Sequence, residues 1–192
     1  SSFFVLLVIL TNNAKLTIKN VSLNPTRLGL FDLLITMGAK ISLQETGASN
    51  GEPFGDLNVM SSELNNVDIR EEIIPNIIDE IPILAIARIF ANGNFEIRKA
   101  KELRFKESDR ISALCHNFLL LGLNVEEFDD GFRISGKIKN RKPIFNSFGD
   151  HRIAMAFSIL SCLLDKGGKV DGFESVSVSN PDFIKQIRSI ID

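Results

Sequence analysis

A helix that ends at a glycine and is followed at once by a short strand recurs along this chain, and this repeat restricts the fold more than any other feature. The junctions at residues 37–41 (MGAKI) and 121–125 (LGLNV) are two copies of the same unit. Apolar residues at helical spacing precede each glycine, and glycine tolerates the left-handed conformation in which many helices end. Helices that alternate with strands in this way predict a layered α/β or α+β fold.

The repeat predicts four helices, each ending at a glycine, with a strand after each one. Helices are expected over residues 24–38, 82–93, 111–122 and 150–167, and strands over residues 39–43, 95–98, 123–128 and 169–172. Turn sequences at 51–53 (GEP) and 130–131 (DG) precede strands at 57–60 and 132–135, which indicates hairpins. The repeated unit is therefore close to β-α-β-α-β-β, and the hairpin strands favour mixed sheets over purely parallel ones.

Residues 104–110 (RFKESDR), directly before the third helix, carry five charges of both signs. The N-terminus of a helix already favours anions, and Lys106 and Arg110 add positive charge to it. Glu107 places a proton-transfer group beside these cations. A solvated run of charges is the plain alternative. The fourth helix also starts with cations, at residues 150–152 (DHR), where each exposed cation costs ~0.3–1 kcal/mol.

The second helix starts differently, after residues 79–82 (DEIP), which place carboxylates where a cap belongs. Asp79 is an N-cap in the plain interpretation. Repeated units place equivalent helix ends on the same side of a domain, so we expect one site that holds a multiply anionic substrate and transfers protons. Arg110 and Arg152 suit carboxylates and phosphates, and Asp79 or Glu107 would supply general acid–base catalysis worth ~10²–10⁴-fold in rate.

The composition argues against several other classes of function. The 192 residues are 44% hydrophobic and 24% charged, which is typical of a soluble globular protein with one large domain, or one domain and part of another. The net charge of −2 gives no overall attraction to nucleic acid or to an anionic membrane. Residues 3–10 are apolar but too few to span a bilayer, so a buried strand or helix is expected there.

Metal and nucleotide chemistry find little support in the sequence. His116 and His151 are the only histidines, and neither has metal-ligand spacing to a cysteine or to the other. No phosphate-binding or dinucleotide glycine motif follows a predicted strand. Cys115 and Cys162 fall within predicted helices and are expected to be thiols in the core.

Three motifs occur in a specific order: residues 79–82 (DEIP), 102–111 (ELRFKESDRI) and 149–156 (GDHRIAMA). Together they resemble the EPSP synthase family, the 3-phosphoshikimate 1-carboxyvinyltransferases of the shikimate pathway, which leads to chorismate and the aromatic amino acids. Residues 24–27 (NPTR) and 37–39 (MGA) are also similar to this family. The resemblance covers essentially the whole chain and corresponds to the C-terminal part of the family's sequence.

The resemblance implies a fold of two domains, each built from three β-α-β-α-β-β units as an inside-out α/β barrel, with the active site between them. Residues 1–22 would then be the end of the N-terminal domain and the crossover from it, with a strand starting at residues 1–4. Residues 23–192 would form the C-terminal enolpyruvyl transferase domain. The chain starts without Met inside an apolar segment, which also suggests a fragment.

The resemblance also implies a reaction, in which the 5-hydroxyl of shikimate 3-phosphate attacks C2 of phosphoenolpyruvate and phosphate leaves. By matched position, Asp79 is the proton acceptor and Glu107 exchanges a proton with the methylene carbon of phosphoenolpyruvate. Lys106 contacts shikimate 3-phosphate close to both substrates and is counted with the catalytic residues. Glu102 is assigned to the same substrate, since some members have a substrate-contacting Asn there.

Arg110 and Arg152 would bind the carboxylate of phosphoenolpyruvate, with His151 beside them. The resemblance implies neither a metal nor an organic cofactor. Some members have a further phosphoenolpyruvate-binding Lys where residues 178–180 (VSN) stand in this chain. That contact is expected to be missing or to come from another residue.

Two other functions remain open at this point. The first is a UDP-N-acetylglucosamine enolpyruvyl transferase, which shares the fold and type of chemistry. The second is a non-catalytic half-domain that binds anions or a partner protein. In the enzyme interpretation the partners are the two small substrates, without nucleic acid or membrane, and a missing N-terminal domain completes the site. The fragment alone would be inactive, whereas the full-length protein would be a cytoplasmic monomer.

Overall fold

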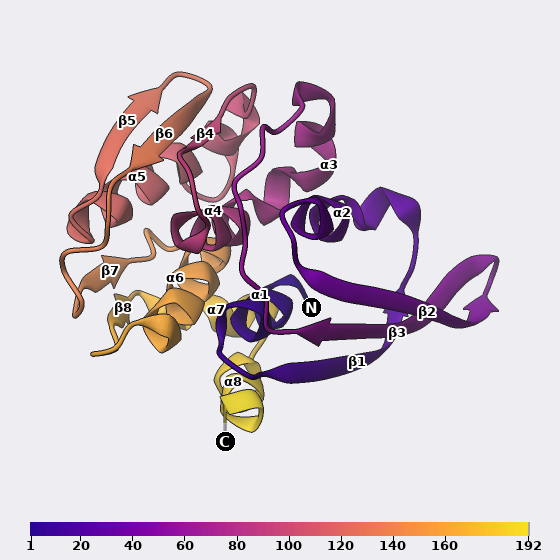
Figure 1. Ribbon diagram of the computed structural model, residues 1–192. Coiled ribbons are helices and arrows are strands. Elements are labelled where there is room, and N and C mark those ends of the chain that lie inside the picture. Colours follow the sequence, from indigo (N-terminus) through magenta and orange to yellow (C-terminus); the bar gives the residue numbers. More distant parts are fainter. Residues whose placement is uncertain (192) are drawn as a thin grey trace.

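The computed structural model describes residues 1–191, apart from the side chain of Thr26 (Figure 1). The strands of this part of the chain are β1 (Lys15–Ser22), β2 (Lys40–Ser49), β3 (Glu52–Met60), β4 (Phe95–Ile97), β5 (Asn124–Phe128), β6 (Gly131–Ser135), β7 (Ile144–Asn146) and β8 (Lys169–Asp171). Its α-helices are α1 (Ser2–Leu10), α2 (Gly29–Thr36), α3 (Ile74–Ile77), α4 (Ile81–Phe90), α5 (Arg110–Leu120), α6 (His151–Leu163), α7 (Val176–Ser179) and α8 (Phe183–Ile191).

Two of the three small sheets share one strand order. In the first, β1 and β2 flank β3, which runs antiparallel to both. In the second, β4 and β5 flank β6 in the same arrangement. In the third, β7 pairs directly with β8 in parallel. Each unit is therefore a β-α-β crossover, through α2, α5 or α6, and the first two units insert a hairpin strand between the crossover strands.

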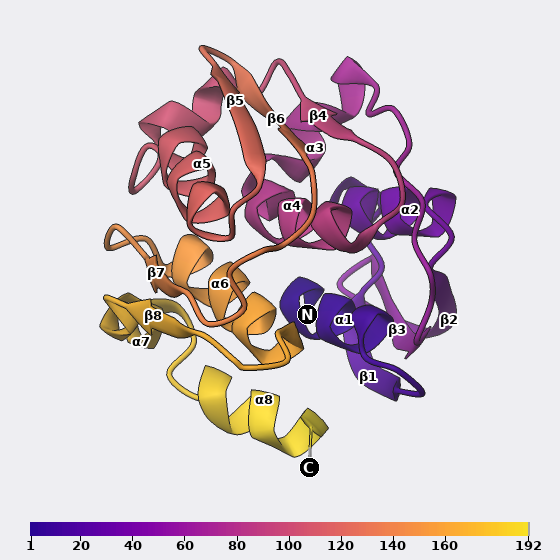
Figure 2. The same ribbon diagram turned by 60° about the vertical axis from the view of Figure 1, so that its left-hand side comes forward.

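The apolar helices form the centre of the molecule, and the sheets lie around them (Figures 1 and 2). Buried residues cover all sides of α4, and all of them except Arg88 are apolar, as expected of a helix in the core. Pro82 lies in its first turn. Helices α1, α4 and α6 contact one another. Within the described chain, no helix combines the length and the apolar character that a membrane crossing requires.

The predicted helix–glycine–strand units are confirmed. Gly38 and Gly122 follow α2 and α5 with φ of +105° and +77°, in the left-handed region that favours glycine. Both predicted hairpins are present, as β2–β3 and β5–β6. The first helix begins later than predicted, because residues Pro25–Arg27 form a 3₁₀ turn before α2.

Other predictions need correction. Residues 1–4 do not start a strand, because Ser1 is the N-cap of α1 and the next three residues belong to that helix, whose apolar side chains are largely buried in the core. Of the buried strand and the buried helix that were expected for residues 3–10, the structure shows the helix. The hairpin strands do not make mixed sheets, because every pairing in the first two sheets is antiparallel. Cys115 is buried as predicted, but Cys162 is exposed.

Residues 1–22 pack with the rest of the described chain. Helix α1 belongs to the same hydrophobic core as α4 and α6, and β1 pairs with β3. The assignment of residues 1–22 to a preceding domain stays a prediction.

Candidate active site

The starts of three helices meet at Asp79. Asp79 lies in a 3₁₀ turn, Ile78–Glu80, that leads into α4. Arg110, the first residue of α5, places Nη1 3.0 Å from Asp79 Oδ1. Arg152, in the first turn of α6, donates from Nη1 to the main-chain oxygen of Asp79 at 2.8 Å. Lys106 Nζ is 3.6 Å from Asp79 Oδ1. The convergence of helix starts expected from the sequence is therefore present.

A buried ion pair joins the starts of α5 and α6. Arg110 Nε donates to Asp150 Oδ2 at 2.8 Å, and the two side chains are 3% and 0% exposed. Asp150 also caps α6, because its Oδ1 accepts from the backbone N–H groups of Arg152 at 2.8 Å and Ile153 at 3.3 Å. Burial by itself raises the pKa of Asp150, but the charge and hydrogen bond of Arg110 and these two N–H groups bring that pKa below its usual value.

A second carboxylate, that of Asp109, lies at the start of α5. Asp109 caps the helix by accepting from the backbone N–H of Ser112 at 3.1 Å. Arg104 binds Asp109 at 2.7 Å and Glu127 of β5 at 3.0 Å, which fastens the loop before α5 to the second sheet. The cations at both helix starts thus have partners inside the protein, which the sequence analysis did not anticipate.

Lys106 lies between two carboxylates. It forms an ion pair with Glu102, one helical turn earlier, in addition to its contact with Asp79. The hydrogen bond from Lys106 to Glu102 is the main reason why the pKa of Lys106 lies above its usual value, and the charge of Asp79 adds to it. Lys106 is therefore cationic at neutral pH.

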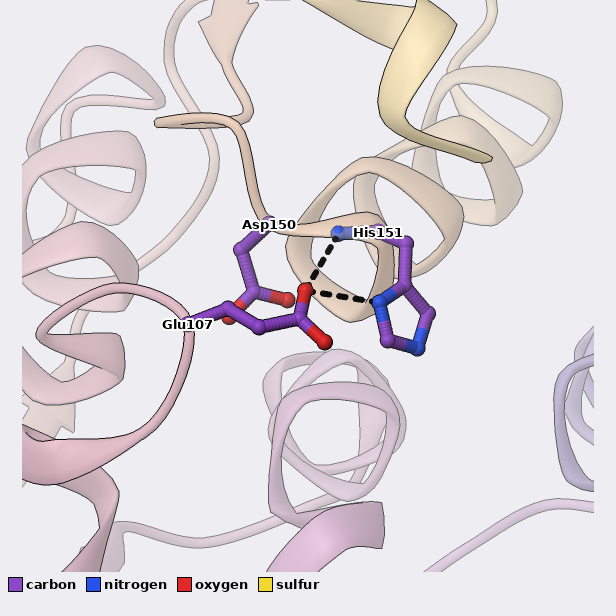
Figure 3. A group of neighbouring side chains, drawn as sticks. All are labelled: Glu107, Asp150 and His151. Atoms are coloured by element: carbon purple, nitrogen blue, oxygen red, sulfur yellow. Dashed lines mark hydrogen bonds and ion pairs between the residues drawn. The ribbon is translucent and has the colours of Figure 1, made fainter. Parts of the chain in front are cut away.

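Glu107 and His151 face each other across the site (Figure 3). Glu107 Oε2 lies 2.7 Å from His151 Nδ1 and 3.4 Å from the backbone N of His151. Glu107 comes from the loop before α5 and His151 from the first residue of α6. The contact joins a carboxylate and an imidazole, which are both groups that transfer protons.

Glu107, His151 and Asp150 also bring their potential ligand atoms within 4.8 Å of one another (Figure 3). The oxygens of Asp150 are already occupied, because Oδ2 accepts from Arg110 and Ser108 and Oδ1 from two backbone N–H groups. A metal ion would have to displace the buried guanidinium. The donors suit a hydrogen-bonded network better than a metal site, and the expectation of a site without a metal stays a prediction.

Two neighbouring carboxyl groups differ in their pKa. Burial raises the pKa of Asp79, but the cations Arg152, Lys106 and Arg110 outweigh it and hold the pKa below its usual range. Glu80 lies 3.6 Å from Arg152. Burial nevertheless raises the pKa of Glu80, and the charge of Asp79 adds to the increase. Asp79 is therefore ionised at neutral pH and can accept a proton.

A cavity of about 810 Å³ lies beside this network. Asp79, Glu80, His151 and Arg152 line it, and so does Arg27. The volume lies within the range of small-molecule sites. The carboxylate, the imidazole and the guanidinium are thus available to a ligand of that size.

The seven site residues predicted from the sequence lie close together: five are linked through Asp79 and Lys106, and Glu107 and His151 form a separate pair beside Asp150. The predicted members are Asp79, Glu102, Lys106, Glu107, Arg110, His151 and Arg152. Asp150 was not predicted from the sequence as the buried partner of Arg110, although its place directly before a helix is a cap signal. Glu80, whose side chain lines the cavity, was not predicted either.

The network holds more carboxyl groups than cations. Among the described residues it contains the carboxyl groups of Asp79, Glu80, Glu102, Glu107 and Asp150 and the cations Lys106, Arg110 and Arg152, and the cation Arg27 lines the adjoining cavity. Cations bind phosphate and carboxylate groups through charge-assisted hydrogen bonds. Within the network, each of the three cations already contacts a carboxylate of the protein.

Comparison with known proteins identifies related sequences. A model of the family described as EPSP synthase (3-phosphoshikimate 1-carboxyvinyltransferase) matches residues 1–187. A 3-phosphoshikimate 1-carboxyvinyltransferase of Petrotoga mobilis is 46% identical over 194 residues, which cover 99% of this chain and 45% of that protein. One of Aquifex aeolicus is 42% identical over 193 residues, with 100% and 45% covered. The chain thus spans about half the length of the curated relatives it matches.

Solved structures agree with the predicted fold class. An EPSP synthase from Acinetobacter baumannii superposes with a TM-score of 0.86 at 32% identity, over 98% of this chain and 44% of that one. The enolpyruvyl transferase NikO from Streptomyces tendae has a TM-score of 0.71 at 17% identity, over 98% and 41%. The second likeness shows the fold alone. The α/β fold of the enolpyruvyl transferases is therefore confirmed.

Proposed function

Because the chain belongs to the EPSP synthase family, we propose that it forms part of an enzyme that transfers the enolpyruvyl group of phosphoenolpyruvate to the 5-hydroxyl of shikimate 3-phosphate. The hydroxyl oxygen adds to C2 while C3 gains a proton, which gives a tetrahedral intermediate. Loss of phosphate from C2 and of a proton from C3 then restores the double bond, and the proton taken from the hydroxyl leaves with the phosphate. The observation that carries the proposal is the meeting of three helix starts at Asp79.

Asp79 accepts the proton of the 5-hydroxyl in this proposal. Three cations hold its pKa low, so it is ionised before the substrates bind. Phosphate and carboxylate groups of the substrates would compete for Lys106, Arg110 and Arg152. As these cations turn toward the substrates, the pKa of Asp79 rises toward neutral pH, where a general base is more effective. Binding of the substrates thereby activates the base.

Glu107 and His151 handle the proton at C3. The Glu107 carboxyl group donates a proton to the methylene carbon as the hydroxyl adds to C2, and it takes a proton back when phosphate leaves. Its contact with His151 Nδ1 at 2.7 Å orients the carboxyl group, and the imidazole can hold the proton when the carboxyl group does not. One residue can serve both steps because the intermediate gains and loses its proton at the same carbon.

Arg152 and Arg110 bind the carboxylate of phosphoenolpyruvate, and Lys106 with Glu102 contacts shikimate 3-phosphate. Arg152 lines the cavity and can present its guanidinium to the ligand. Arg110 is 3% exposed, and three of its nitrogen atoms already contact Asp150 or Asp79. When phosphoenolpyruvate binds, Arg110 would contact both Asp79 and the substrate carboxylate. Its bond to Asp150 keeps the guanidinium oriented.

Further cations come from outside this chain. The excess of carboxylates in the network motivates this part of the proposal, since both substrates carry a phosphate and a carboxylate. We assign residues 23–192 to a C-terminal domain and residues 1–22 to the end of a preceding domain that completes the site. The isolated chain is then inactive. The complete protein is proposed to be a cytoplasmic monomer that uses no cofactor.

The test is phosphate release by the chain mixed with the portion of the Petrotoga mobilis relative that it does not match. Phosphoenolpyruvate is supplied with either shikimate 3-phosphate or UDP-N-acetylglucosamine. The proposal expects release with shikimate 3-phosphate alone and none from either half by itself. Release only with the nucleotide sugar would assign the other transferase activity. Release by the isolated chain would contradict the need for a second half.

A further inference from the structure

Asn117, a side chain outside the catalytic network, binds the segment that leads into Asp150. Asn117 is 0% exposed and lies on α5, seven residues beyond Arg110. Its Oδ1 accepts from the backbone N–H of Asn146 at 2.9 Å, and its Nδ2 donates to the backbone oxygen of Asn146 at 2.8 Å. The amide therefore pairs with both backbone groups of Asn146, as a neighbouring strand would.

Residues separated by seven positions lie on the same face of a helix. On this face of α5, Asn117 holds Asn146 at the end of β7, and Arg110 holds Asp150, four residues later. One helix face thus binds both ends of residues 146–150. Helix α5 lies beside β7, which precedes α6 in the chain (Figure 2).

The short connection between these two attachments has an unusual backbone. Phe148 and Gly149 have positive φ angles of +54° and +74°. Residues other than glycine rarely adopt such angles, so the backbone at Phe148 is unusual. Asn146 Oδ1 accepts from the N–H of Phe148 at 2.7 Å, and Ser147 Oγ from that of Gly149 at 3.2 Å. These contacts depend on the placement of Asn146 and Ser147, because both residues supply the acceptors.

We propose that Asn117 is a positioning residue, whose side-chain amide fixes residues 146–152 against α5 and so sets the spacing between Arg110 and the start of α6. Asp150, His151 and Arg152 follow this connection directly. A shift of Asn146 would therefore move the acceptor of Arg110 and the two groups that line the cavity. The proposal concerns the geometry of the site and depends on the proposed function only for its effect on catalysis.

The matched variants are Asn117→Leu and Ser158→Ala. Leucine keeps the size of the asparagine side chain but removes both hydrogen bonds to Asn146. Ser158 is a buried polar residue of α6, and its hydroxyl donates to Ala154 within its own helix. The control therefore removes a buried polar group of α6 whose hydrogen bond stays within that helix.

The measurement is hydrogen exchange of the Arg110 Nε–H by NMR on this chain, compared with the backbone amides of β6. Asn117→Leu is expected to accelerate the exchange at Arg110 by about tenfold more than that of the β6 amides, because the bond to Asp150 opens locally. Ser158→Ala is expected to change both by the same factor. The proposal would be overturned if Asn117→Leu accelerated the exchange of the Arg110 Nε–H and of the β6 amides by the same factor. It would also be overturned if the exchange at Arg110 did not change. If the leucine variant does not fold, Asn117→Ser also removes the amide. It is measured in the same way and judged by the same comparison of exchange rates.

Discussion

Arg110 and Asp150 form a fully buried ion pair that joins the first residue of α5 to the cap of α6. Their Nε and Oδ2 atoms are 2.8 Å apart, and Arg110 reaches Asp79 with its other end at 3.0 Å. One guanidinium therefore binds the carboxylates that precede two different helices. The relationship explains how a polar site is held rigid in a chain whose surrounding core is apolar.

Loss of this pair should be costly. Asp150→Asn removes the buried counter-charge of Arg110 and leaves only the exposed carboxylate of Asp79 beside its guanidinium. Breaking a buried ion pair costs about 3–5 kcal/mol in unfolding free energy. Urea denaturation measures the effect. Asp165→Asn is the control, because the pair of Asp165 with Arg141 is exposed and contributes about 1 kcal/mol at most. Similar losses in the two variants would contradict the assigned role.

Stability should decrease in acid because of Asp150. The folded-state pKa of Asp150 is lowered, so its contribution is fully present above the unfolded pKa of about 3.9 and is lost as the pH falls through the lower folded value. Glu80 acts in the opposite direction, since burial raises its pKa. The unfolding free energy, measured by urea titration from pH 6 to pH 3, should fall less steeply below about pH 4 in Asp150→Asn than in the parent chain. Parallel profiles would refute this account.

Arg88 is expected to lower the stability of the chain. Arg88 is 3% exposed, its Nε and Nη1 have no hydrogen-bond partner among the described residues, and burial lowers its pKa to about 10. Its contacts are a bond to the Val67 oxygen at 2.6 Å and stacking on Phe95. Arg88→Met should raise the unfolding free energy by about 1–3 kcal/mol in urea denaturation, because it removes a buried charge and keeps the packing. A loss of stability would show that the two contacts outweigh the desolvation of the guanidinium.

The two cysteines should differ in reactivity. Cys115 is buried, and burial raises its pKa to about 12, so very little thiolate exists near neutral pH. Cys162 is exposed. A disulfide reagent at pH 8 is expected to label Cys162 in the folded chain and both cysteines in urea. Rapid labelling of Cys115 under native conditions would contradict its burial.

The sequence predicted several of the units that depend on local signals, but it missed strand β1 and the amphipathic helix α8. Glycine stops, apolar spacing and turn residues located α2, α4, α5, α6 and both hairpins. Strand β7 was missed because its three residues form a strand only by pairing with β8, far away in the chain. The strand expected at residues 1–4 was wrong because a wholly apolar stretch does not reveal its period, and central packing favours a helix there.

The residues of the site could be predicted from the sequence, but the ion pairs and hydrogen bonds among them could not. Charged residues at helix starts pointed to Lys106, Arg110 and Arg152, and the repeat indicated that these starts share one side. The partner of Arg110 is forty residues away, and its identity depends on how α5 packs against α6. Asn117 gave no signal at all, because an asparagine inside a helix is usually unremarkable.

Asp79 is proposed to be the base of an enolpyruvyl transfer. Phosphate release from phosphoenolpyruvate and shikimate 3-phosphate, with the chain combined with the complementary half of its relative, tests it most directly. Asp79→Asn keeps the shape of the side chain and should lower kcat by about 10²–10⁴-fold, whereas Asp165→Asn should leave kcat unchanged. A mixture in which Asp79→Asn releases phosphate at the parent rate would contradict the account.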